Sequence, residues 1–74
     1  MKTFNPQALK ILMDREKKKS AWLAREMRKR TGSATSTSQI DGWANGRIMP
    51  STPNLMSLAD VFGVPMEHFI MEDI

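Results

Sequence analysis

The side chains best suited to recognise another molecule gather on one short predicted helix, residues 37–45. On a helical wheel its inward arc holds Ile40, Trp43 and Ala44. The outer arc holds Ser38, Asp41, Gly42 and Asn45, with Thr37 and Gln39 at its edges. A helix with such a short, hydrogen-bonding face can enter the DNA major groove, which is about 12 Å wide, and reach base edges. The alternative is an ordinary short helix on the protein surface.

Base recognition would use the polar groups of this helix. The amide of Gln39 can pair bidentately with adenine, and the methyl group of Thr37 can touch the methyl group of thymine. Positive charge for the phosphates lies upstream, because residues 15–30 contain eight basic and two acidic residues, within a chain of net charge +3. A basic end on a small domain suits a polyanion, although a solvated helix face would look the same.

Five helices are predicted to position these groups, at about residues 6–17, 21–30, 37–45, 53–62 and 65–70. Apolar residues recur at helical spacing in each segment, and none alternates for long enough to be a strand. The expected boundary signals are capping side chains before the helices and glycines after them. The expected caps are Asn5, Ser20, Ser36 or Thr37, and Thr52, and the expected stops are Gly32, Gly46 and Gly63. The chain is therefore expected to be all-α, one compact domain over residues 1–74.

The order of these elements resembles the lambda-repressor-like, Cro/repressor-type helix-turn-helix family. The resemblance rests on Leu23-Ala24, on Ser36, Ile40, Trp43 and Gly46, on Pro50-Ser51, and on the aliphatic fourth helix that closes in Phe62-Gly63-Val64. It covers almost the whole chain. It implies the compact five-helix fold of that family, and a sequence-specific regulator of transcription that binds double-stranded DNA.

By position, the resemblance assigns base contacts to Thr37, Ser38, Gln39, Asp41 and Gly42. Asp41 would repel phosphate but can accept from a cytosine amino group. Phosphate contacts are assigned to Lys19, Ser20, Ser36, Asn45 and Arg47. Our own extension adds Arg28, Lys29 and Arg30, for which a solvated basic helix end is an equal alternative.

The sequence departs from the family pattern in two places. The stretch from Met27 to Ser36 is about six residues longer than the usual tight turn, which is similar to POU-specific domains. The second helix starts with Lys19-Ser20, where the family has Ser or Thr followed by Gln. Trp22 lies at the edge of the inward stripe, so it either covers the first helix or flanks the DNA backbone.

Composition narrows the class of function. The chain has no cysteine and a single histidine, His68, so no metal site, cofactor or small-molecule substrate is expected. It also lacks the clustered titratable groups of an enzyme. No apolar run approaches the roughly 20 residues of a membrane span, so a cytoplasmic location, in a bacterium or a phage-infected host, is expected.

The expected function is that of a Cro-like phage, prophage or bacterial repressor that binds its operator as a homodimer. Apolar side chains near the C-terminus offer a dimer contact, namely Phe69, Ile70, Met71 and Ile74. The alternative is an antitoxin-like or adaptor domain, in which the same fold binds a protein.

Overall fold

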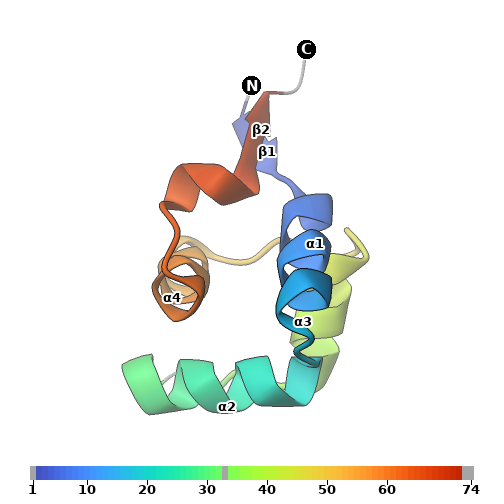
Figure 1. Ribbon diagram of the computed structural model, residues 1–74. Coiled ribbons are helices and arrows are strands. Elements are labelled where there is room, and N and C mark those ends of the chain that lie inside the picture. Colours follow the sequence, from blue (N-terminus) through green and yellow to red (C-terminus); the bar gives the residue numbers. More distant parts are fainter. Residues whose placement is uncertain (1, 33, 73–74) are drawn as a thin grey trace.

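The computed structural model describes residues 2–32 and 34–72, which form a helical domain with a small two-stranded ribbon (Figure 1). The helical elements are α1 (Pro6–Glu16), α2 (Ser20–Thr31), α3 (Thr37–Ala44), α4 (Thr52–Phe62) and the 3-10 turn η1 (Met66–Phe69). The strands are β1 (Lys2–Phe4) and β2 (Ile70–Glu72). Within the described residues, no helix has the length and apolar character needed to cross a membrane.

The four α-helices lie close to their predicted positions, and local chemistry explains their ends. The side chain of Asn5 accepts a hydrogen bond of 3.1 Å from the Gln7 amide, which caps α1 as expected. Two other predicted caps were wrong. Ser20 and Thr52 are the first residues of α2 and α4, and the capping positions belong to Lys19 and Ser51, neither of which forms a side-chain capping bond.

The C-terminal segment corrects the prediction of a fifth α-helix and of a chain without strands. Residues Met66–Phe69 form a single 3-10 turn, and the chain then runs into β2, which pairs antiparallel with β1. Thr3 faces Met71 and Phe4 faces Ile70 in this register. Phe4 and Phe69 are both buried, with ring centroids 6.2 Å apart, so this aromatic contact joins the two ends of the chain.

The core lies between the helices and the ribbon. In Figure 1, α2 crosses one end of the molecule, beneath α1, α3 and α4, and the ribbon lies at the opposite end. The fully buried side chains come from the four α-helices and η1, namely Leu9, Leu12, Leu23, Met27, Ile40, Trp43, Leu58 and Phe69. Their contacts fix α3 against α1 and α2, and so determine which side of α3 faces outward.

Trp22 packs against the core beside α4. It is half-buried, and its ring lies 6.1 Å from that of Phe62 on α4. The Nζ atom of Lys18 lies 4.9 Å from the centre of the Trp22 ring, within the range of a cation–π contact. One basic side chain in the turn before α2 is thus held against the protein.

Candidate nucleic-acid interface

The start of α3 is fixed by a reciprocal pair of hydrogen bonds. The Gln39 amide N–H donates to Ser36 Oγ over 3.2 Å, and the Ser36 N–H donates to Gln39 Oε1 over 3.1 Å. This capping box satisfies two backbone donors that the first turn would otherwise leave free. It also uses one lone pair of the Gln39 side-chain oxygen, so the bidentate pairing expected with adenine would share this oxygen with the Ser36 amide.

The remaining turns of α3 are anchored from within. Ile40 and Trp43 are fully buried, and Ala44 is half-buried against the core. The polar residues of this helix and its end are exposed, namely Thr37, Ser38, Gln39, Asp41 and Asn45. The predicted division of the helix into a buried and a polar side is therefore confirmed for these residues.

Gly42 is the exception on the outer side, because it is buried beneath Ile48. A Cβ atom built on Gly42 would lie only 2.7 Å from Ile48 Cδ1. Gly42 itself is therefore not available for the base contact that its position suggested. The neighbouring backbone holds the covering segment in place, since the amides of Arg47 and Ile48 donate to the Gly42 carbonyl over 2.9 and 3.2 Å.

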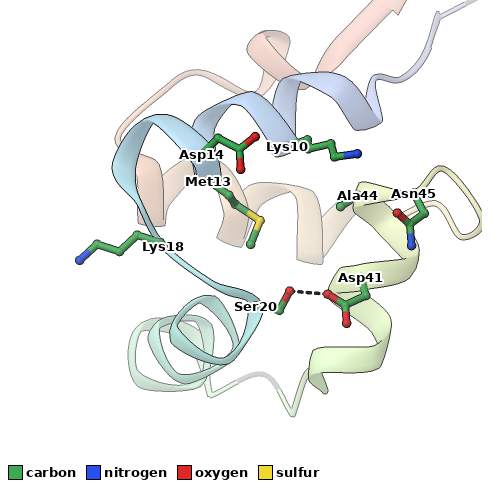
Figure 2. Close-up of a pocket in the computed structure, with 8 residues that line it drawn as sticks. All are labelled: Lys10, Met13, Asp14, Lys18, Ser20, Asp41, Ala44 and Asn45. Atoms are coloured by element: carbon green, nitrogen blue, oxygen red, sulfur yellow. Dashed lines mark hydrogen bonds between the residues drawn. The ribbon is translucent and has the colours of Figure 1, made fainter.

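A hydrogen bond between Ser20 and Asp41 connects the beginning of α2 to the outer side of α3. The hydroxyl of Ser20 donates to the carboxylate of Asp41, as Figure 2 shows. The two residues lie in an open cleft of about 310 Å³ between α1, α2 and α3. Met13 and Asp14 of α1 also line this cleft, with Asn45 at the end of α3.

Seven of the eight predicted phosphate contacts fall into two separate groups, and the eighth, Ser36, caps the start of α3. The first group lies near the start of α2 and the end of α3, and consists of Lys19, Ser20, Asn45 and Arg47. Ser20 is half-buried, and the other three are exposed. The start of α2 lies near α3, whereas its C-terminal end extends beneath α4 (Figure 1). A helix of 12 residues is about 18 Å long, so residues 28–30 lie at a distance from the first group.

Two of the three basic residues at that far end are already paired. Arg30 lies 3.4 Å from the Asp60 carboxylate on α4 and 3.7 Å from Glu26. Lys29 lies 3.8 Å from the other carboxylate oxygen of Glu26. Because the basic partners in these pairs are exposed to solvent, the pairs are weak, and this end of α2 is only partly neutralised and can still contact phosphate.

The residues expected to form a dimer contact differ in accessibility. Phe69 belongs to the core and is fully buried, so it is not available to a partner. Ile70 is half-buried, and Met71 is 42% exposed. Ile74 lies outside the described residues.

Two features of this surface were not predicted from the sequence, namely the Ser20–Asp41 hydrogen bond and the cover that Ile48 forms over Gly42. The first joins residues 21 positions apart, with no local pattern to indicate it. The second left a signal, since a glycine within an otherwise regular helix suggests the close approach of another group.

A protein-family model described as helix-turn-helix matches residues 9–69, which is most of the chain. No curated protein and no solved structure matches the sequence at a significant level.

Proposed function

Because the chain belongs to the helix-turn-helix family of the lambda-repressor and Cro kind, whose members bind double-stranded DNA, we propose that it is a sequence-specific regulator of transcription. In this role the protein places α3 in the major groove of DNA. The observation that carries this proposal is the division of α3, with Ile40 and Trp43 buried and the polar groups of Thr37, Ser38, Asp41 and Asn45 exposed.

Base contacts are proposed for the exposed residues of α3. Thr37 and Ser38 offer hydroxyl groups at its first turn, and Gln39 offers the amide N–H₂ that its capping box leaves free. One oxygen of the Asp41 carboxylate accepts a hydrogen bond from the Ser20 hydroxyl. Its other oxygen can accept from a cytosine amino group.

Phosphate contacts are proposed on both sides of α3. Lys19 lies at the start of α2 and offers its charge, and Ser20 follows it, where the first backbone amides of the helix favour an anion. The single hydroxyl proton of Ser20 is donated to Asp41, so a phosphate here would be held through these backbone amides. Ser36, Asn45 and Arg47 flank the two ends of α3. At the far end of α2, Arg28 is exposed and forms no ion pair within the described residues, whereas Lys29 and Arg30 are paired. Arg28 is therefore the better candidate for a phosphate contact there.

The quaternary arrangement proposed is a homodimer on a two-fold symmetric operator, as in a Cro-like repressor of a phage, prophage or bacterium. Two recognition helices would then lie one helical turn of DNA apart, about 34 Å. Met71 and the exposed part of Ile70 are the remaining candidates for the dimer contact. Occupation of a promoter by such a dimer would repress transcription.

Selection of bound duplexes from a random library tests this proposal. The expected result is an enriched, inverted-repeat motif with half-sites centred about 10 base pairs apart. Gln39→Ala should relax base preference at one position, and Arg47→Ala should weaken binding to all sequences alike. Absence of any enriched motif would contradict sequence-specific binding and would favour the alternative of a protein-binding adaptor.

A further inference from the structure

Ile48 occupies the space in which a side chain at position 42 of α3 would lie. Three of its carbon atoms, Cδ1, Cγ1 and Cβ, lie 2.7, 3.0 and 3.4 Å from the Cβ position of an alanine built at Gly42. The side chain of Ile48 thus lies flat along α3, where glycine alone leaves room for it. In effect, a residue outside the helix supplies the surface that the helix lacks at this position.

The backbone around Ile48 keeps this side chain in place. The chain reverses at Gly46, whose φ is +76°, and the amides of Arg47 and Ile48 then both donate to the Gly42 carbonyl. Gly46 also packs against Pro6 of α1, since its built Cβ position lies 3.2 Å from Pro6 Cγ. Ile48 is therefore a positioned side chain, and yet it remains 43% exposed.

The exposed part of Ile48 lies on the side of α3 that carries the polar groups. Gly42 follows Ser38 by four residues and precedes Asn45 by three, and residues at these spacings share one face of a helix. Both Ser38 and Asn45 are exposed. An apolar side chain is thus placed between hydrogen-bonding groups of the surface proposed to contact bases.

We propose that Ile48 is a specificity-determining residue that contacts the C5-methyl group of a thymine in the major groove. This inference rests on the proposed function. The thymine methyl is the apolar group that the four bases present at their major-groove edges, and apolar side chains are the groups that recognise it. Gly42 leaves the space beside α3 that the Ile48 side chain fills, and Ile48 then makes the contact with the thymine methyl.

Met49 offers a matched comparison because it is more exposed than Ile48, at 62%, but is directed elsewhere. Its sulfur lies 4.0 Å from Thr3 Oγ1 on β1, at the ribbon and not over α3. If exposed apolar surface near α3 acted without regard to position, Met49 would contribute as much as Ile48. The proposal assigns the contact to Ile48 alone.

The test replaces each thymine of the selected site in turn by deoxyuridine, which lacks only the methyl group. With the wild-type chain, one thymine per half-site should weaken binding by about fourfold when replaced, the effect of one buried methyl-sized group. Ile48→Ala should bind the thymine and uracil sites equally, and Met49→Ala should keep the wild-type difference. Thr37→Ser, which removes the methyl group of another proposed base contact, should keep the difference at the thymine assigned to Ile48.

Two further variants keep the test decisive. Ile48→Val retains most of the side chain, so it should fold normally and show a reduced difference if the alanine variant is unstable. Gly42→Ala should displace Ile48 and abolish the difference while leaving residue 48 unchanged. Equal methyl sensitivity in wild type and in the folded Ile48 variants, or loss of sensitivity in Thr37→Ser instead, would overturn the inference although DNA binding stands. A wild-type chain that selects no sequence would overturn the proposed function and this inference together.

Discussion

At the scale of single residues, Gly46 is the position where the backbone depends most on the absence of a side chain. Its φ of +76° lies in the left-handed region, and Pro6 of α1 leaves no free space beside it. Gly63 has a similar φ of +66° but no atom within 4 Å of its built Cβ position. Both glycines therefore have a left-handed backbone, but only Gly46 has a neighbouring side chain, that of Pro6, close to its Cβ position.

We expect Gly46→Ala to destabilise the domain more than Gly63→Ala. The left-handed conformation alone costs an alanine about 1 kcal/mol, which both variants should show. Gly46→Ala adds a contact with the rigid ring of Pro6, and crowding of this kind costs roughly 1 kcal/mol or more. Urea denaturation of both variants and the wild type gives the two free energies of unfolding. Equal losses would show that the contact with Pro6 is relieved without cost.

The residue scale also shows where the sequence was informative and where it was not. The spacing of Ile40 and Trp43 was enough to place both in the core, because a helical period predicts a buried face directly. The position of Ile48 could not be predicted in this way, since it depends on how the chain turns at Gly46. The burial of Gly42 follows from that turn, and so does the loss of its expected base contact.

At the scale of elements, α3 is a helix of eight residues, too short to be stable on its own. Tertiary burial of Ile40 and Trp43 supplies most of its stability, and the capping box fixes the residue at which it begins. The chain offers a pair of variants that separate the two halves of this box. Ser36→Ala removes the side-chain acceptor for the Gln39 amide, whereas Gln39→Glu keeps an acceptor for the Ser36 amide.

We expect Ser36→Ala to lower the free energy of unfolding by about 1 kcal/mol, the usual effect of losing an N-terminal cap. Gln39→Glu should leave stability nearly unchanged or slightly raised, because a glutamate completes the same box and favours the start of a helix. Thermal denaturation followed by circular dichroism measures both. A loss in Gln39→Glu as large as that in Ser36→Ala would show that the box does not form in solution.

The elements also differ in how well their sequences predicted them. The four α-helices were found within one or two residues of their ends, because each carries a regular apolar period and recognisable boundary residues. The ribbon was missed, since each strand has three residues, too few for alternation to be visible. Its pairing places Phe4 opposite Ile70 and so joins opposite ends of the chain, beside the contact between the Phe4 and Phe69 rings. Only the folded core determines this.

At the scale of the whole molecule, positive charge is concentrated in one part of the chain. Residues 15–30 hold an excess of six positive charges, whereas basic residues after Thr31 are limited to Arg47. The structure places this segment at the end of α1, in the turn before α2 and along α2 itself. The start of α2 lies near α3 and its end lies beneath α4 (Figure 1). The ion pairs of Arg30 with Glu26 and Asp60 reduce the positive field at the far end. The end of α2 near α3 therefore has the better position to hold phosphate.

The small size of the domain makes its stability a sensitive measure of DNA binding. A chain of 74 residues has a limited core, and a ligand that binds only the folded state adds its binding free energy to that of folding. At a duplex concentration of about 100 times Kd, this amounts to about 2.7 kcal/mol. For a domain of this size, the corresponding rise in Tm is roughly 10–20 °C.

We therefore expect the selected duplex to raise Tm by this amount at low salt, and a scrambled duplex of equal length to raise it less. Both shifts should decrease as salt is added, because phosphate contacts release counterions when they form. Lys19→Ala, at the end of α2 near α3, should decrease both shifts more than Lys29→Ala, whose ammonium is already paired with Glu26. Equal decreases in the two variants would show that the far end of α2 holds phosphate as well. A Tm unaffected by either duplex at low salt would contradict DNA binding by this domain.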